Sequence, residues 1–149
     1  MKLFLDTNVL VDVIAAREPF VADSRAVLNL CETGKAEGIV SVLTLCTVSY
    51  ILRKFVTPGI LRVKLREIRT VLRPVDLSVS LLDQAIASSQ SDFEDAVQFH
   101  TAVYSGAEYI ITRNAKHFPQ DNIPVLSPTA FIALFNTKDI GLQSGQNEA

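Results

Sequence analysis

Five short apolar runs alternate with segments of helical periodicity, and this alternation constrains the fold more than any other feature of the chain. The runs are apolar at consecutive positions, so both faces of each strand should be covered, as in a buried parallel sheet. They are Leu3–Leu5, Gly38–Leu43, Pro74–Leu77, Tyr109–Thr112 and Pro124–Leu126.

Helical patterns occupy most of the intervening sequence. They cover Ala22–Thr33, Thr44–Phe55, Ile60–Leu72, Ser80–Ser88, Asp92–Ser105 and Thr129–Phe135. Strands that alternate with helices predict an α/β fold, here a three-layer α/β/α sandwich around a mostly parallel five-stranded sheet. At 149 residues the chain fits one domain, which we expect over residues 1–138, with a flexible C-terminal tail over residues 139–149.

Charge and composition exclude several function classes. The net charge of −2 argues against binding nucleic acid through the charge of the whole molecule. No glycine-rich phosphate-binding loop occurs, which argues against a nucleotide cofactor. Asp6 interrupts the apolar start, so we expect no secretory signal, no membrane association and a soluble, cytoplasmic protein.

Two acidic segments lie at the ends of these predicted elements. Asp6-Thr7-Asn8 ends the first strand, and Asp92-Phe93-Glu94-Asp95 opens a helix. Asp92 and Asp95, three residues apart, share a helix face, whereas Glu94 is expected on a different side. Ligands bind at the carboxyl ends of strands in such folds, so these carboxylates could together hold Mg²⁺ or Mn²⁺. Asn8 and Thr112 could orient them.

A purely structural role explains the same residues. Ser91 could be the N-cap of the helix, with Glu94 reaching back from the third helical position. Acidic side chains in a first helical turn also stabilise the helix dipole without any ligand. Asp6 could equally cap the next helix. Both interpretations stay open from the residues alone.

The sequence resembles the PIN-domain family of metal-dependent ribonucleases, which includes VapC-like toxins. Four segments carry the resemblance in order: Leu3–Leu10, Ser41–Thr44, Asp92–Gln98, and Tyr109–Asn114 with His117-Phe118. The resemblance implies an endoribonuclease that uses Mg²⁺ or Mn²⁺, is the toxin of a toxin–antitoxin pair, and forms a homodimer. It also implies that the products carry 3′-hydroxyl and 5′-phosphate ends.

The chain departs from the family pattern at two acidic positions. A glutamate usual in the helix after the second strand corresponds to Thr47, and an aspartate usual in the fourth motif corresponds to Asn114. By resemblance, Asp6 and Asp95 are the retained metal ligands, with Asp92 as a third. The predicted supporting residues are Asn8, Thr112, Asn114 and Glu94. The alternative is a weakened or inactive module that binds RNA or protein.

Basic residues gather in one predicted helix. Arg62, Arg66, Arg69 and Arg73 are spaced by four, three and four residues, so they fall within one arc of a helix. This row could bind the phosphates of RNA, it could bind an acidic segment of an antitoxin, or it could be a solvated helix face. His100 and His117 have no nucleophile partner by spacing and are left out of the predicted site.

Overall fold

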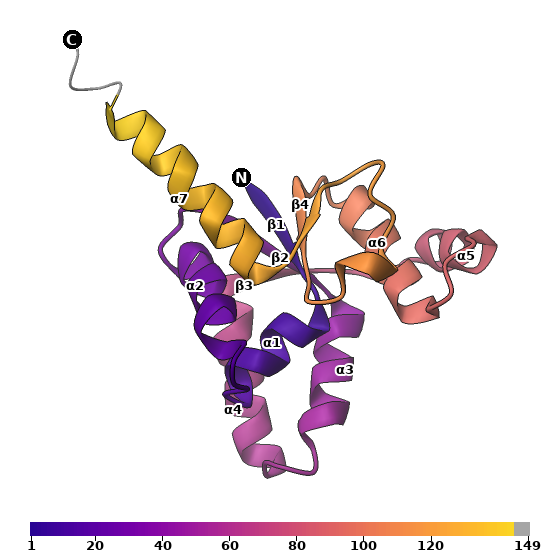
Figure 1. Cartoon of the computed structure of the whole chain (residues 1–149). Helices are drawn as coiled ribbons and strands as arrows, with labels where there is room; N and C mark the ends of the chain where they lie inside the picture. Colours follow the sequence, from indigo (N-terminus) through magenta and orange to yellow (C-terminus); the bar gives the residue numbers. More distant parts are fainter. Residues whose placement is uncertain (145–149) are drawn as a thin grey trace.

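A computed structural model describes residues 1–144, with side chains through Lys138, and confirms the predicted fold class. Its five strands form one sheet in the order β3-β2-β1-β4-β5, and every neighbouring pair is parallel (Figure 1). All five predicted strands are present within a few residues of their expected bounds. They are β1 (Lys2–Leu5), β2 (Glu37–Ser41), β3 (Leu72–Val75), β4 (Tyr109–Ile111) and β5 (Val125–Leu126).

The helices fill the intervals between the strands. They are α1 (Thr7–Ile14), α2 (Val21–Glu32), α3 (Val42–Leu52), α4 (Pro58–Val71), α5 (Val79–Ala87), α6 (Phe93–Tyr104), the 3₁₀ turn η1 (Ala115–His117) and α7 (Pro128–Ser144). None of the helices in this described part of the chain is long and apolar enough to cross a membrane.

The structure confirms that Asp6 caps the next helix, because it accepts a hydrogen bond from the Thr7 N–H at the start of α1. One predicted helix bound needs correction. The last helix was predicted to end at Phe135, yet α7 continues to Ser144. The tail predicted over residues 139–149 therefore begins within α7, and residues 145–149 lie outside the described residues.

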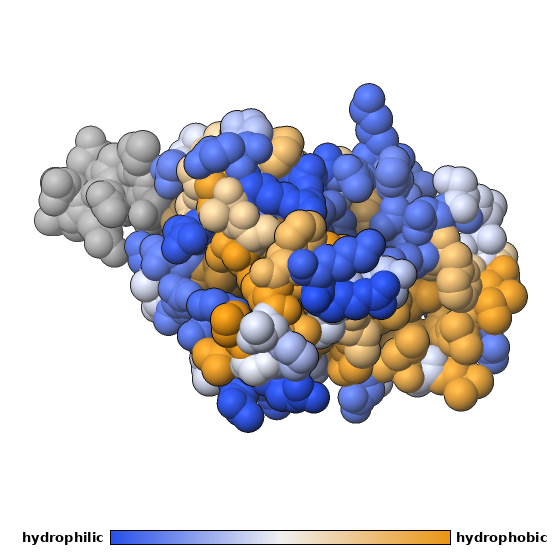
Figure 2. Space-filling model, turned by 90° about the horizontal axis from the view of Figure 1, so that it is seen from below, coloured by the Kyte–Doolittle hydropathy of each residue, from blue (hydrophilic) through white to orange (hydrophobic). Residues whose placement is uncertain are grey.

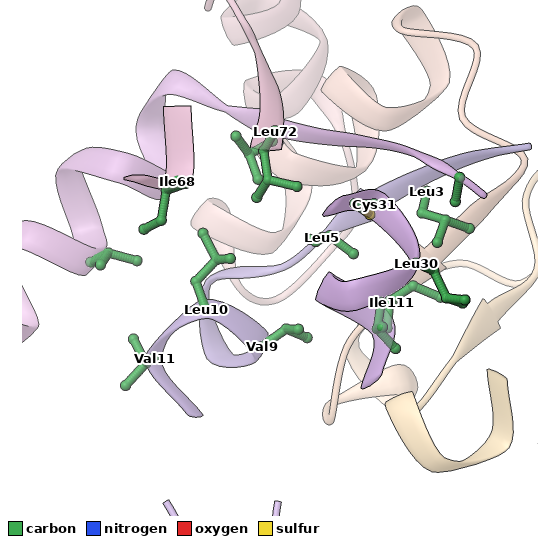
Figure 3. Packing of buried hydrophobic residues seen from close by; sticks show 14 of the residues in the cluster. Leu3, Leu5, Val9, Leu10, Val11, Leu30, Cys31, Ile68, Leu72 and Ile111 are labelled. Carbon is green, nitrogen blue, oxygen red and sulfur yellow. The ribbon is translucent and has the colours of Figure 1, made fainter. Parts of the chain in front are cut away.

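Alternate residues of each strand contribute to separate cores on the two faces of the sheet. Leu3 and Leu5 pack with residues of α1, α2, α3, α4 and α7, including Val9, Leu30 and Ile68 (Figure 3). Phe4 points to the opposite face and packs with a cluster that includes Phe99 of α6. The three strand residues are fully buried, which confirms the three-layer sandwich with a sheet covered on both sides.

The sheet reverses its strand order beside β1. The chain runs from β1 outward to β2 and β3, then returns to place β4 on the other side of β1. A crevice forms at such a switch point, outside the carboxyl ends of the strands. Asp6 follows β1 and Thr112 follows β4, and the Asp6 N–H donates to the Ile111 carbonyl at 3.0 Å. The topology therefore brings these two residues to one edge.

Candidate active site

A cleft of about 270 Å³ lies at this edge and collects four carboxylates. Asp6 comes from the end of β1, and Asp92, Glu94 and Asp95 come from the start of α6. The remaining polar and basic lining residues are Thr7, Asn8, Arg17, Thr47, Gln98, Asn114 and His117. Hollows of similar size occur elsewhere on the described surface, so its carboxylates distinguish this cleft rather than its volume.

Asp6 is the most buried of the four carboxylates, with 3% of its surface exposed. Its Oδ1 accepts a hydrogen bond from the Thr7 N–H at 2.6 Å. Its Oδ2 accepts one from the Asn8 amide at 2.7 Å and one from the Thr112 hydroxyl at 2.6 Å. Three neutral donors thus fix the orientation of this carboxylate.

Asn8 and Thr112 also form hydrogen bonds with the loop after β4. The Asn8 amide donates to the Thr112 hydroxyl at 3.1 Å, and the Asn8 carbonyl oxygen accepts from the Arg113 N–H at 3.1 Å. The Asn114 N–H donates to the Thr112 hydroxyl at 3.0 Å. These three residues, all predicted to support the site, link the first and fourth motifs around Asp6.

The N-cap of α6 is Asp92, not Ser91 as the capping-box pattern predicted. Asp92 has an extended backbone, and its Oδ1 accepts a hydrogen bond from the Asp95 N–H at 3.0 Å. The cap moves one residue along because an aspartate carboxylate satisfies the free N–H groups as well as a serine hydroxyl does. Asp92 is exposed and lines the cleft while it caps the helix.

Glu94 also lies in the cleft, which corrects the prediction that it points to another side. Its Oε1 accepts hydrogen bonds from the Thr7 hydroxyl at 3.3 Å and from the Gln98 amide at 3.4 Å. With Asp92 as the N-cap, Glu94 is the second helical residue instead of the third. It is therefore no longer at the position from which a glutamate completes a capping box.

Asp95 contacts a histidine that the sequence analysis left outside the site. His117 Nδ1 lies 3.1 Å from Asp95 Oδ2, with the Asp95 side chain 13% exposed and the imidazole 55% exposed. The turn η1 brings His117 back over the start of α6. The signal was present in the sequence, because His117 directly follows the fourth motif.

Burial raises the pKa values of three of these carboxylates, and repulsion by neighbouring carboxylates raises those of Asp95 and Glu94 further. For Asp95, burial first and then the charges of Asp6 and Asp92 raise the pKa to about 6, against a lowering by His117. Burial raises the pKa of Asp6, although hydrogen bonds from Thr112 and other donors oppose it. Burial raises the pKa of Glu94 as well, and hydrogen bonds from Thr47 and Thr7 lower it.

This donor set suits a hard divalent cation. Carboxylate oxygens are the ligands that Mg²⁺ and Mn²⁺ prefer, and a cation among them would relieve the repulsion that raises their pKa values. Among the described residues, no three Asp, Glu, His or Cys side chains converge closely enough to hold one ion.

The predicted arginine row is shorter than expected. Arg62, Arg66 and Arg69 are exposed on α4. Arg73 instead lies in β3, where its Nε meets Glu37 Oε1 at 2.7 Å. Proline at position 74 is incompatible with continuing the helix, which ends at Val71. Arg73 is therefore not part of the row on α4.

Two further lining residues were missed, Arg17 and Gln98. Arg17 lies in the turn between α1 and α2, and no periodic pattern marks that turn. Gln98 is 1% exposed, and its Oε1 accepts a hydrogen bond from the Thr44 hydroxyl at 3.3 Å. Its spacing from Glu94 and Asp95, four and three residues, places it on their helix face and could have revealed it.

The fold and the cleft define a class of α/β proteins with an acidic site at the switch point of a parallel sheet. Comparison with known families makes this more specific, because the model of the PIN domain matches residues 2–116. The chain belongs to the PIN-domain family.

Its similarity extends to individual proteins. It is 26% identical to "Ribonuclease VapC1" of Aquifex aeolicus over 141 residues, which cover 91% of this chain and 96% of that protein. A toxin–antitoxin complex from Klebsiella pneumoniae matches with a TM-score of 0.63 and 23% identity, covering 85% of this chain and 97% of the other. VapC20 of Mycobacterium tuberculosis, described as a sarcin–ricin loop cleaving toxin, matches with a TM-score of 0.58 and 16% identity, covering 80% and 91%.

Proposed function

We propose that this protein is an endoribonuclease that depends on Mg²⁺ or Mn²⁺ and acts as the toxin of a toxin–antitoxin pair. One observation carries the proposal: in a PIN-family domain, buried Asp6 at the β1/β4 switch point shares a cleft with Asp95 and Glu94. The similarity to a VapC ribonuclease over nearly the whole chain supports the reaction class.

The retained acidic residues supply the ion-binding groups. Asp6 and Asp95 hold the ion, and Asp92, which is exposed at the rim, contributes a further carboxylate. When bound, the ion lowers the pKa of a water nucleophile and stabilises the charge that develops on the scissile phosphate.

The chain's own residues set the geometry for this chemistry. Asn8 and Thr112 prevent Asp6 from rotating, since each donates a hydrogen bond to its Oδ2. Asn114 lines the cleft and offers amide groups for an attacking water. Arg17, the other basic lining residue besides His117, is placed to bind a phosphate of the RNA.

The experiment compares RNA cleavage by the wild-type protein with that of Asp6→Asn and Asp95→Asn. Both substitutions keep the shape of the side chain and remove a negative charge, so we expect manganese-stimulated cleavage to fall by at least about a hundredfold. Asp83→Asn on α5, an exposed aspartate outside the cleft, is the matched control and should cleave like the wild type. Undiminished cleavage in both cleft variants would refute the proposed reaction.

A second candidate function rests on Thr47 and Asn114, which replace two acidic residues of the family pattern. In this case the domain binds RNA without cleaving it. Binding that is sensitive to salt and persists in EDTA, with no turnover in Mg²⁺ or Mn²⁺, would favour this function over the first.

The toxin role follows from the same cleft. We expect induced expression of the wild-type chain to arrest bacterial growth, and expression of Asp95→Asn to leave growth unaffected. Exposed apolar side chains on α3, α4 and their connection, among them Tyr50, Phe55 and Ile60, offer a surface for an antitoxin, and the arginines of α4 suit an acidic segment of it. Normal growth with accumulated wild-type protein would contradict a toxin.

A homodimer is the remaining part of the proposal. Apolar side chains gather on the side of the molecule where α5 lies (Figure 2; compare Figure 1), and Val79 and Ile86 are 73% and 64% exposed. Such a patch on a small protein marks an interface. Light scattering should give twice the chain mass for the wild type and the single chain mass for Val79→Glu/Ile86→Glu. A monomeric wild type would exclude the dimer.

A further inference from the structure

We propose that Glu94 of α6 takes over the ion-facing role of the glutamate that α3 lacks, and that Thr47 positions it. The inference rests on the proposed metal-dependent function and extends it, since it assigns the missing carboxylate to a particular residue of this chain.

The position of Thr47 is the first observation. Thr47 lies on α3, at the point where the family pattern places a glutamate, and it lines the same cleft as Glu94. The side chains of Thr47 and Glu94 therefore reach the same space, one from α3 and the other from α6. The Glu94 carboxylate of α6 thus occupies the region of the cleft where a glutamate on α3 would otherwise lie.

One hydrogen bond, a helical turn deeper in the molecule, links the same two helices. The Thr44 hydroxyl of α3 donates to Gln98 of α6 at 3.3 Å, and both residues are buried. Thr47 follows Thr44 by three residues, and Glu94 precedes Gln98 by four, so the second pair lies directly above the first. The spacing therefore places Thr47 and Glu94 next to the Thr44–Gln98 hydrogen bond, one turn nearer the mouth of the cleft.

The contacts of Glu94 orient its carboxylate inward. The Thr7 hydroxyl reaches Oε1 at 3.3 Å from α1, and the Gln98 amide reaches the same oxygen at 3.4 Å along α6. The carboxylate thus accepts hydrogen bonds from side chains of two helices, α1 and α6. A solvated glutamate in a first helical turn needs none of them, and the capping role belongs to Asp92.

Charge explains why Thr47 and Glu94 occur together. A second glutamate at position 47 would bring another negative charge against Glu94 beside Asp6 and Asp95, where repulsion is already high. A hydroxyl at position 47 adds no charge and is a group that can donate a hydrogen bond to a carboxylate. An uncharged residue at position 47 and a glutamate at position 94 are therefore compatible in one cleft. On this view the chain departs from the family pattern because the metal-binding glutamate has moved from α3 to α6.

The experiment measures Mn²⁺ affinity of the full-length protein by isothermal titration calorimetry and by electron paramagnetic resonance of the free ion. We expect Glu94→Gln to weaken Mn²⁺ binding by at least about tenfold, with Glu32→Gln on α2 as an exposed control that binds normally. Thr47→Val should weaken binding less, and Thr47→Ser, which keeps the hydroxyl, should restore it.

The decisive variant moves the carboxylate back to α3. Thr47→Glu/Glu94→Gln keeps the number of acidic residues in the cleft and should bind Mn²⁺ within about tenfold of the wild type, with RNA cleavage recovering in parallel. Thermal melting in EDTA verifies that each variant is folded.

The outcomes separate this inference from the function on which it rests. If Asp95→Asn loses Mn²⁺ binding while Glu94→Gln retains it, the relocation is wrong and the metal site stands. A double variant that melts like the wild type but binds as weakly as Glu94→Gln would also overturn the relocation. A wild-type protein that binds no Mn²⁺ and cleaves no RNA would overturn both proposals.

Discussion

Two buried aspartates of α1 have opposite electrostatic surroundings. Asp6 caps the helix with 3% of its surface exposed, and Asp12, less than two turns later, is fully buried. Asp12 meets a full positive charge, because Arg113 Nε lies 2.8 Å from its Oδ2. Asp6 meets neutral donors and shares its cleft with other carboxylates.

The different surroundings of Asp12 and Asp6 indicate that the first stabilises the fold and the second serves the candidate site. The ion pair of Asp12 and Arg113 is completed by the Ser24 hydroxyl, 3.2 Å from the same oxygen, and by Phe20, whose ring lies 4.2 Å from the guanidinium. It joins α1 to α2 and to the loop after β4. Around Asp6 the carboxylates outnumber the basic groups, and the charge of Arg113 opposes only part of the rise in pKa that burial causes. The closely paired charge of Asp12 stabilises the fold, whereas the excess of negative charge around Asp6 is what a bound cation would neutralise.

The largest expected effect comes from breaking the compensated pair. Arg113→Leu leaves the carboxylate of Asp12 buried without its partner, so the free energy of unfolding should fall by about 3–5 kcal/mol. Urea denaturation followed by circular dichroism measures this loss. Adding Asp12→Asn to Arg113→Leu should regain part of it, because the stranded charge is removed. A loss below about 1 kcal/mol would mean that the pair is not a main contributor to stability.

Removing a charge from the cleft should have the opposite effect on stability and raise the free energy of unfolding. The pKa of Asp95 is raised from 3.8 to about 6, so its ionisation at neutral pH destabilises the metal-free fold. Asp95→Asn should therefore raise the free energy of unfolding at pH 7.5 in EDTA by about 1–2 kcal/mol, less than the whole shift implies because water in the cleft screens these charges. Asp83→Asn should change it by less than about 0.5 kcal/mol. A destabilised Asp95→Asn protein would contradict the contrast between the two regions.

The effect of removing the Asp95 charge should also depend on pH. A carboxyl whose folded pKa is raised contributes stability that is fully present below its unfolded pKa and is lost as the pH rises through the folded value. The difference between wild type and Asp95→Asn in EDTA should thus vanish as the pH falls from about 6 to about 4. Protons also compete with the ion, so protonation of Asp95 should lower the Mn²⁺ affinity of the wild type about fivefold between pH 6 and pH 5. Affinity independent of pH over this range would exclude Asp95 as a ligand.

The strands and the switch point were predictable from sequence because they depend on local patterns. Runs such as Leu3–Leu5 are apolar at every position, which suffices to place a buried strand. Asp6 and Thr112 follow from the strand ends. Glu94 was misjudged because its surroundings come from Thr7 and Thr47 on other helices, and the shift of the cap to Asp92 alters which way it faces. The pairing of Asp12 with Arg113 spans 101 residues of sequence and has no local signal.

The smallest expected effect concerns the arginines, where the same distinction between compensated and free charge applies. Arg73 is paired with Glu37 in the sheet, whereas Arg62 and Arg69 are exposed on α4. If α4 binds the phosphates of RNA, Arg62→Ala and Arg69→Ala should each weaken binding by less than about 1 kcal/mol, whatever the RNA sequence. Each should also lower the slope of log affinity against log salt by about 1.

Fluorescence anisotropy over a salt series measures both quantities. Arg73→Ala is the matched control and should leave the slope unchanged, because that guanidinium already has a carboxylate partner. Equal slopes for all three variants and the wild type would show that the row on α4 is a solvated helix face and would leave RNA binding to the cleft alone.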